Sequence, residues 1–464
     1  MQPMNSNKQR GCCEMRKTFC SIFFADSKSH SDKNEEKIKM HVLTELIKSD
    51  MKPALGVTEP GAIAFAVSTA KAHMKGDVKK VNLRLNSGMY KNAFTCGIPG
   101  TSEVGNYYAA ALGAIAADPK KGLECLEGIG KTEEEAAGKM IEAGMITVSM
   151  SSITSRIFIE ATVTGADSEA VVTIQDAHTN ITKITENGIT VFEKEVKAAE
   201  ESKEEVPLIH QYTLAQMVEY VNTVPAKELE FIKDAYIVNY ELLQEGLKSP
   251  KTTYGPYLLK KNGGVLVSED ERKTASLFCN GAIEARVIGL SKPAMSITGS
   301  GAHGIIATMP LYAVYKINHY TEEQLLRATA LSYLVCMYIK EYSGKLSAFC
   351  GCAIAAGTGM ACALAWLKGA GAETMEKVIN NMASSITGMI CDGGNQGCTM
   401  KGIVAVDAAF DSVELAMDGV YIYNAHGING ATPEETMHNM GLIASPGMTG
   451  TEKTIVEILD HKNQ

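Results

Sequence analysis

The sequence comprises 464 residues, of which 45% are hydrophobic and 21% are charged, and its formal net charge at pH 7 is −9. Its length exceeds that of one ordinary domain core, so we expect roughly two or three domains. The negative net charge argues against nucleic acid or a membrane surface as a partner, because either would require a basic surface that displaces counterions. Twelve cysteines are scattered through largely apolar sequence, which is typical of a reducing compartment. We therefore expect a cytoplasmic protein with free thiols.

Residues 1–38 are predicted to be a disordered extension. Residues 27–39 are almost wholly polar and cannot bury apolar surface. The short apolar stretch of residues 19–25 follows Arg16 and Lys17 as in a signal sequence, but no clear small-x-small cleavage pattern accompanies it. We therefore expect the first domain to begin near residue 39.

Residues 39–206 are predicted to form an α+β domain with a mainly antiparallel sheet. Apolar residues recur with helical spacing in residues 40–48, 62–73, 107–117 and 133–143. Alternation of apolar and polar residues predicts strands at residues 80–87, 146–150, 156–165, 170–176, 181–184 and 190–195. The sequence Glu186-Asn187-Gly188 predicts a hairpin turn. No strand–helix–strand alternation requires parallel strands.

Residues 207–464 are predicted to form an all-helical domain. A charged run at residues 194–205, followed by Pro207, predicts a linker before it. Helical periodicity then occurs in residues 214–221, 226–246, 273–288, 303–315, 321–341, 353–368, 372–386 and 402–417. The uncharged run of residues 346–367 exceeds the length of roughly 18 residues that a membrane span needs. It consists mostly of Ala, Gly, Cys, Ser and Thr, which favours a buried core helix.

Three glycine-rich breaks interrupt these helices and are candidate ligand sites. They comprise residues 297–304, the segment around Cys350, and residues 391–398. Glycine permits close backbone approach, so amide N–H groups at these turns can face a carboxylate or a cluster sulfide. The first break resembles a phosphate loop, but it lacks the Gly-Lys-Ser/Thr ending and is weak evidence for a nucleotide.

The cysteines of the second and third breaks are candidate metal ligands. Cys391 and Cys398 are separated by six residues, and Cys350 and Cys352 precede them by about forty residues. Such thiols can bind a soft metal or an iron–sulfur cluster. The alternative is that they are buried structural cysteines. A structural zinc site is a poorer match, because neither a C-x2-C pair nor a histidine pair lies nearby.

Six motifs are spread over roughly residues 40–460. They are Leu55-Gly56-x-Thr58-Glu59-Pro60, Ser87-Gly88-Met89-Tyr90-Lys91-Asn92, Cys279-Asn280-Gly281, Thr298-Gly299-Ser300-Gly301-x-His303-Gly304, Cys350-Gly351-Cys352 and Cys391-x6-Cys398. In content and order they resemble the UPF0597 family, which is related to archaeal L-cysteine desulfidase and to the alpha region of the iron–sulfur L-serine dehydratases. The resemblance implies a 4Fe-4S cluster held by three cysteines, with the fourth iron open to substrate. Position by position, it implies Cys391, Cys398 and Cys350 as ligands, with Cys352 as the alternative to Cys350.

The same resemblance implies a lyase that acts on a small L-amino acid such as L-cysteine or L-serine. The reaction would eliminate hydrogen sulfide or water, giving 2-aminoacrylate and then pyruvate and ammonia. A substrate that chelates the open iron has its leaving group polarised by a Lewis acid. We expect Ser87, Lys91, Asn92 and Ser300 to hold the carboxylate and amino groups of the substrate, and we expect the chain to form a homo-oligomer.

One position departs from the family pattern and affects the choice of catalytic base. In the desulfidase, a cysteine directly before Thr-Glu-Pro removes the α-proton, whereas here that position is Val57, which cannot accept a proton. We expect His303 and Glu59 to be the catalytic residues, ahead of Lys91 and Cys279, because imidazole and carboxylate groups titrate in the useful range when partly buried. The alternative is a cluster-binding protein without lyase activity, a sensor or binder, that has lost the base.

Overall fold

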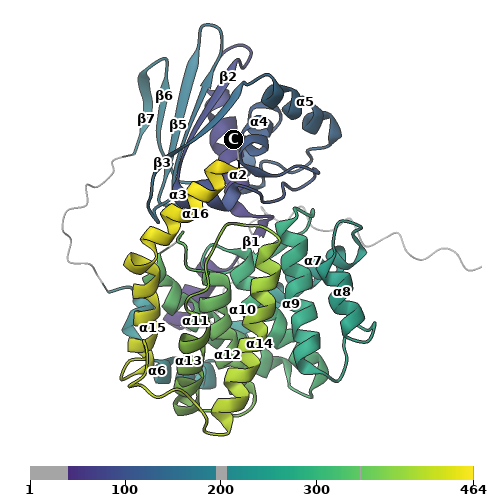
Figure 1. Ribbon diagram of the computed structural model, residues 1–464, viewed down its shortest axis with the longest axis vertical. Coiled ribbons are helices and arrows are strands. Elements are labelled where there is room, and N and C mark those ends of the chain that lie inside the picture. Colours follow the sequence, from purple (N-terminus) through teal and green to yellow (C-terminus); the bar gives the residue numbers. More distant parts are fainter. Residues whose placement is uncertain (1–39, 195–205, 345, 463–464) are drawn as a thin grey trace, which may run out of the picture. The chain divides into compact units, whose positions relative to one another are not determined.

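The computed structural model describes residues 40–194, 206–344 and 346–462. The predicted extension of residues 1–38 and almost all of the predicted linker lie outside the described residues. The described residues belong to one compact unit, in which a sheet with its covering helices precedes a set of packed helices (Figure 1). This order of elements confirms the predicted fold class, an α+β region followed by a helical region.

The sheet has six strands in the order β3-β2-β4-β5-β6-β7. The strands are β2 (Lys80–Asn86), β3 (Ile146–Ser152), β4 (Phe158–Thr164), β5 (Glu169–Gln175), β6 (Ile181–Glu186) and β7 (Ile189–Glu193). In β4 and β5 fully buried residues alternate with partly exposed ones, so one face of the sheet packs against helices. Asn187 and Gly188 both have positive φ at the turn between β6 and β7, as the predicted hairpin requires.

The pairing of β2 with β3 is parallel, whereas the other neighbouring strands of this sheet are antiparallel. The sequence did not predict this parallel pair. The chain between the two strands forms α3 (Ser87–Ala93), α4 (Gly105–Ile115), the 3-10 turn η1 (Pro119–Glu124) and α5 (Lys131–Glu142). A parallel pair needs such a long crossover, and here it covers the sheet with helices.

Helix α2 (Thr58–Ala72) is buried along almost its whole length, between the sheet and α4. Small side chains make this close packing feasible. A Cβ atom at Gly113 of α4 would lie only 2.9 Å from the backbone of Ala64 in α2. The first turn of α2, which carries Thr58 and Glu59, is therefore held firmly in place by its surroundings.

The helical region contains eleven helices in the described residues from 206 onward. They are α6 (Leu214–Thr223), α7 (Lys233–Lys248), α8 (Tyr254–Lys261), α9 (Glu271–Val287), α10 (Gly301–Ile317), α11 (Glu322–Ser343), α12 (Gly357–Leu367), α13 (Ala372–Ile386), α14 (Gly397–Met417), α15 (Pro433–Leu442) and α16 (Thr449–His461). Short 3-10 or π-helical turns join some of them, namely η2 (Leu208–Gln211), η3 (Ala226–Ile232), η4 (Cys352–Ala356) and η5 (Ile443–Gly447). Helices α10, α11 and α12 are buried on most faces. Helix α12 forms the second half of the uncharged run of residues 346–367, so the prediction of a buried core helix in this run is confirmed.

A short antiparallel pair joins the start of the described chain to the helical region. Strand β1 (Lys52–Leu55), which follows α1 (Val42–Asp50), pairs with β8 (Pro293–Ser296). Strand β1 ends just before α2, and β8 ends just before α10. Because the strands are antiparallel, Leu55 at the end of β1 pairs with Pro293 at the start of β8, and α2 and α10 begin from opposite ends of the pair.

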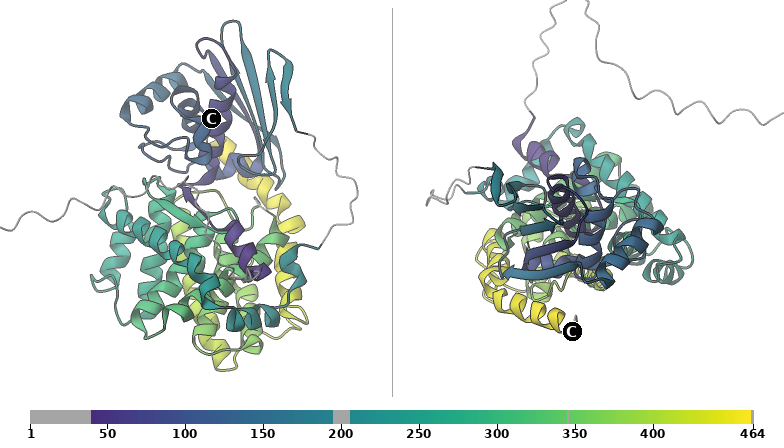
Figure 2. Two further views of the ribbon diagram at one scale, coloured as in Figure 1. Left: turned by 180° about the vertical axis from the view of Figure 1, so that it is seen from behind. Right: turned by 90° about the horizontal axis from the view of Figure 1, so that it is seen from above.

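Helix α16 returns to the α+β region and packs on α3 (Figures 1 and 2). The hydroxyl group of Tyr90 donates a hydrogen bond to Asp460 at 2.6 Å. The amino group of Lys91 forms an ion pair with Glu452, also at 2.6 Å. A helix near the end of the chain thus holds a segment that precedes it by more than 350 residues.

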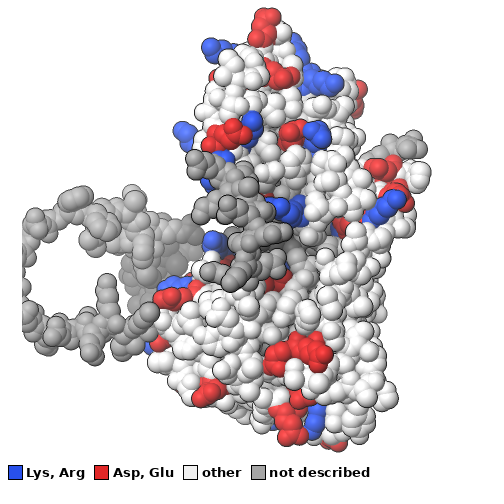
Figure 3. Space-filling model, turned by 90° about the vertical axis from the view of Figure 1, so that its left-hand side faces the viewer, with Lys and Arg blue, Asp and Glu red and all other residues white. Residues whose placement is uncertain are grey.

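None of the helices in the described part of the chain has both the length and the apolar character needed to cross a bilayer. On the face drawn in Figure 3, basic and acidic side chains are interspersed, and much of the surface is uncharged.

Candidate functional site

Two cysteine-bearing segments that are far apart in the chain lie side by side. Phe349 and Ile390 form an isolated antiparallel bridge. Beside it, the N–H group of Cys350 donates to the carbonyl before Ile390 at 3.0 Å, and the N–H group of Cys391 donates to the carbonyl before Phe349 at 2.6 Å. Cys350 therefore lies opposite Met389 and Cys391 lies opposite Ala348, which makes the two cysteines diagonal neighbours across the bridge.

The second segment continues as the cysteine loop, defined as residues 391–398, which joins α13 to α14 and is anchored on α3. The N–H group of Gly394 donates to the carbonyl of Asn92 at 3.1 Å. Gly393 has a φ of 113°, and a Cβ atom there would lie 2.5 Å from the carbonyl oxygen of Lys91, so glycine is required. The loop then curls back, since the thiol of its last cysteine lies 3.5 Å from the carbonyl oxygen of Gly393.

A cavity of about 610 Å³ lies beside the cysteine loop. Its wall includes Cys352, Cys391 and Cys398, together with side chains from the first turns of α2 and α10. Cys350 is only 4% exposed and is not among the described residues that line the cavity. Cys350 thus lies in the bridged part of its segment, diagonal to Cys391, whereas Cys352 lines the cavity together with Cys391 and Cys398. Both remain candidates for the first ligand.

Cys350, Cys391 and Cys398 lie in a buried environment that favours the protonated form of their thiols. Burial raises the pKa of Cys391 and raises the pKa of Cys398 to about 12. A hydrogen bond with Cys352, together with burial, raises the pKa of Cys350. Metal binding to these thiols would therefore release protons.

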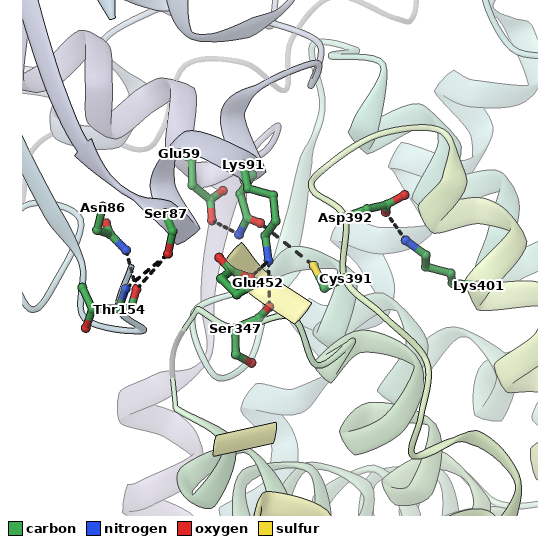
Figure 4. Close-up of polar contacts among 11 residues, drawn as sticks. Glu59, Asn86, Ser87, Lys91, Thr154, Ser347, Cys391, Asp392, Lys401 and Glu452 are labelled. Atoms are coloured by element: carbon green, nitrogen blue, oxygen red, sulfur yellow. Dashed lines mark hydrogen bonds and ion pairs between the residues drawn. The ribbon is translucent and has the colours of Figure 1, made fainter. Parts of the chain in front are cut away.

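Within residues 40–194, 206–344 and 346–462, no three His, Cys, Asp or Glu side chains are arranged to hold a single metal ion. A cubane cluster imposes a different requirement, because each cysteine binds a different iron and the sulfur atoms need not converge on one point. The donor set fits such a cluster, since thiols from both segments meet at one cavity. Positive charge is available nearby: Lys340 lines the cavity, and Lys401 pairs with Asp392 in the cysteine loop (Figure 4).

Glu59 lies in the first turn of α2 and faces the cavity. Its carboxylate accepts hydrogen bonds from Asn92 at 3.0 Å and from Thr58 at 3.2 Å, and Nε2 of His178 lies 3.9 Å away. Burial alone raises the pKa of Glu59, but His178, Asn92 and the charge of Arg286 outweigh it and lower the pKa to about 2. Glu59 is therefore ionised at neutral pH.

His303 lies in the first turn of α10 and also faces the cavity. Its Nδ1 atom contacts the hydroxyl group of Thr298, and its Nε2 atom lies 2.9 Å from the position that a Cβ of Gly351 would occupy. The imidazole thus packs between α10 and the first cysteine segment. Burial, helped by the charges of Lys340 and Arg286, lowers the pKa of His303 to about 3. The ring is therefore neutral at neutral pH.

The four predicted substrate-binding residues do not all face the cavity. Asn92 and Ser300 line it. Lys91 is instead fully buried, with its amino group 2.6 Å from Glu452 and 2.9 Å from the carbonyl oxygen of Ser347 (Figure 4). Ser87 is turned toward the backbone of residue 154, and neither Ser87 nor Lys91 is among the described cavity-lining residues.

Three cavity-lining residues were not singled out from the sequence. His178 lies in the turn between β5 and β6, Arg286 lies at the end of α9, and Lys340 lies near the end of α11. Each is one polar residue in an ordinary turn or helix, so no local motif marks it. Only the packing of the separate elements brings these side chains together.

Comparisons with known proteins agree with the motifs. Residues 120–457 match the model of the family described as serine dehydratase alpha chain. A UPF0597 protein of Clostridium botulinum (strain Langeland) is 40% identical over 427 residues, which cover 90% of this chain and 98% of that protein. A UPF0597 protein of Caldanaerobacter subterraneus subsp. tengcongensis is 32% identical over 418 residues, which cover 90% of this chain and 98% of the relative. The chain therefore belongs to the serine dehydratase alpha chain family and, among its members, to the UPF0597 proteins.

Proposed function

We propose that the protein is an iron–sulfur-dependent lyase that eliminates hydrogen sulfide or water from a small L-amino acid, with L-cysteine and L-serine as the first substrates to test. The observation that carries the proposal is the meeting of two cysteine segments at a cavity that also contains Glu59, His178 and His303. Family membership supports the same reaction class. Titratable groups gathered in one cavity are typical of active sites.

Cys391 and Cys398, with Cys350 or Cys352, are the residues that would hold a 4Fe-4S cluster. When bound, the cluster would supply a Lewis acid that polarises the leaving group on the β-carbon. The Gly393 turn and the bridge between the two segments hold these thiols in place through backbone contacts.

The remaining requirement is a base that removes the α-proton. In the elimination, the Cα–H bond breaks, its proton passes to the base, and the bond from Cβ to sulfur or oxygen breaks. The product 2-aminoacrylate then reacts with water to give pyruvate and ammonia. The base needs a pKa near the working pH to be efficient.

We assign the proton transfer to His178, with Glu59 as its charged partner. With a pKa of about 2, Glu59 is a weak proton acceptor at neutral pH, and the same holds for His303 with a pKa of about 3. Imidazole is the side chain most often used for proton transfer, and Nε2 of His178 lies 3.9 Å from Glu59 at the cavity wall. His303 is assigned a hydrogen-bonding role toward the substrate.

The proposal is tested on protein purified anaerobically and reconstituted with iron and sulfide. We expect bound iron and sulfide and visible charge-transfer absorbance. We also expect release of pyruvate and sulfide from L-cysteine, or of pyruvate alone from L-serine. Cys391→Ala and Cys398→Ala should lose the cluster and the activity. The matched control is Cys362→Ala, because Cys362 is buried in α12 away from the cavity and should be dispensable for both. An iron-free, colourless protein would contradict the proposal, and zinc would indicate a structural metal site instead.

The choice of the first ligand is tested by two further substitutions. Cys350→Ala and Cys352→Ala are compared for iron content and absorbance after identical reconstitution. The variant that lacks the true ligand should lose the cluster, whereas the other should retain it.

A second candidate function is cluster binding without lyase activity, as in a sensor. The observation that favours it is Val57, which lines the cavity at the start of α2, with its methyl carbons 3.0 and 3.3 Å from the position of a Cβ at Gly394. An inert side chain thus stands beside the cysteine loop. If the native chain binds a cluster but is inactive, and Val57→Cys creates activity, this second function is the correct one.

A further inference from the structure

We infer that Arg286 is the anchor of a subsite for the carboxylate group of a small amino acid. Arg286 lies at the end of α9 and lines the cavity, yet it is only 4% exposed. Among the residues that the structure describes, its guanidinium group has no ion-pair partner, and its Nε atom is buried without a hydrogen-bond acceptor. This side chain is the observation on which the inference is built.

A buried guanidinium group without a partner is unfavourable. Arginine stays charged in proteins and offers several N–H donors in a rigid planar fork. Removing such a charge from water is costly unless an anion and hydrogen bonds compensate for it. An anionic group entering the cavity would provide this compensation, so the position favours ligand binding over a purely structural role.

The N-terminus of α10 adds to the positive potential at the same place. A Cβ atom at Gly301, the first residue of α10, would lie 2.6 Å from Nε of Arg286, so the absence of a side chain there makes room for the guanidinium group. Ser300 precedes this helix of 17 residues and provides no side-chain cap. The first N–H groups of the helix and its dipole therefore favour an anion beside Arg286.

The other cations near the site are already engaged. Lys91 is paired with Glu452, and the amino group of Lys340 donates to the carbonyl of Gly344 and lies 3.5 Å from the hydroxyl of Ser343. Arg286 is therefore better placed than Lys91, the residue expected from the sequence, to bind a carboxylate. Its fork matches the two oxygens of a carboxylate group.

The cavity also contains an anion that suits the other end of an amino acid. Glu59 is ionised and lines the same cavity as Arg286. A zwitterionic amino acid would place its carboxylate at Arg286 and the start of α10, and its ammonium group toward Glu59. This identity of the ligand rests on the proposed function, whereas the need for an anion at Arg286 does not.

The test is isothermal titration calorimetry on the whole chain, before and after anaerobic reconstitution, with three unreactive probes. L-alanine has both charged groups but no leaving group, L-alaninamide lacks the carboxylate, and propionate lacks the ammonium group. We expect L-alanine to bind most tightly and propionate to bind more weakly. L-alaninamide should bind about 10- to 100-fold more weakly than L-alanine, because charge-assisted hydrogen bonds contribute about that much.

Variants then assign the effect to Arg286. Arg286→Met should weaken L-alanine binding about 10- to 100-fold, with little effect on L-alaninamide, and Arg286→Lys should recover part of the affinity. Without ligand, Arg286→Met removes a buried charge that has no ion-pair partner, but it also removes the attraction that helps to lower the pKa of Glu59, so the variant should unfold at a temperature close to that of the native chain. The matched control is Arg84→Met, which removes an exposed guanidinium group paired with Glu160 and should bind L-alanine normally.

Other outcomes would overturn the inference. Equal affinity for L-alanine and L-alaninamide in the native chain would do so without any variant. Native-like binding of L-alanine by Arg286→Met would also do so. If that variant does not fold, Gly301→Ala serves instead, because the added methyl group displaces the guanidinium group without removing its charge. Arg286-dependent binding of L-alanine in a chain that releases neither sulfide nor pyruvate would refute the lyase and leave this inference standing.

Discussion

Removing one partner of the buried ion pair between Lys91 and Glu452 should destabilise the protein by a measurable amount. The Lys91 side chain is 0% exposed, that of Glu452 is 7% exposed, and their charged atoms are 2.6 Å apart. The substitution Glu452→Leu leaves the ammonium group with only the carbonyl of Ser347, at 2.9 Å, which cannot neutralise its charge. Breaking a buried pair in this way costs about 3–5 kcal/mol, a large share of a typical stability of about 5–15 kcal/mol.

Urea unfolding of Glu452→Leu, Lys91→Met and the double variant measures the cost of leaving one of these charges unpaired. With a denaturant dependence of about 1–3 kcal/mol/M, each single substitution should lower the midpoint by at least about 1 M. The double variant should be closer to the native chain than either single variant, because removing both charges leaves neither uncompensated. The exposed pair of Lys121 and Glu127, 2.9 Å apart, is the control, and Glu127→Gln should leave the urea midpoint almost unchanged. Single-variant costs as small as this control, or additive costs in the double variant, would refute the reasoning.

Three further predictions concern the cavity and the packing of α10, whose first turn lines it. The pKa of Glu59 falls from an ordinary 4.5 to about 2, so its ionised form should contribute about 3 kcal/mol of stability above pH 4.5, and this stability should be lost progressively as the pH falls toward 2. In acid unfolding, Glu59→Gln should lack this pH-dependent loss of stability. An acid unfolding profile identical to that of the native chain would contradict the lowered pKa of Glu59. His178→Asn should lower kcat about 10²- to 10⁴-fold with little change in KM. His303→Asn should lower kcat by a smaller factor, and a larger loss of kcat in His303→Asn than in His178→Asn would exchange the roles of the two histidines. Gly304→Ala places a Cβ 1.9 Å from a carbonyl oxygen of β8 and should destabilise by at least about 1–3 kcal/mol in thermal unfolding, whereas Gly450→Ala, with nothing within 4 Å, should be neutral or stabilising.

The fold was largely predictable because its elements have clear local patterns. Strand β4 follows the alternation of its side chains, and Asn187 with Gly188 marks the hairpin by turn chemistry alone. The parallel pairing of β2 with β3 was missed because nothing in either strand specifies a neighbour separated by a long crossover. The short pair of β1 with β8 was missed for the same reason.

The candidate site was predictable only where residues form motifs. The motifs led to Glu59, His303 and the cysteines, which lie in or beside the cavity. The motif around Lys91 led us to expect that Lys91 binds substrate. Nothing near it in the sequence reveals that its amino group is paired with Glu452. Arg286 was not recognised, because whether an arginine in a helix is paired depends on side chains from other helices.

The pairing of α16 with α3 has a consequence for the order in which the protein matures. Lys91 leaves the ribosome 361 residues before Glu452, so translation must pass residue 452 before this charge finds its partner. The cysteine loop docks on the same helix α3 and is also translated late. Loading of the proposed cluster during synthesis would therefore precede the completion of its support, so we expect such a cluster to be inserted after translation.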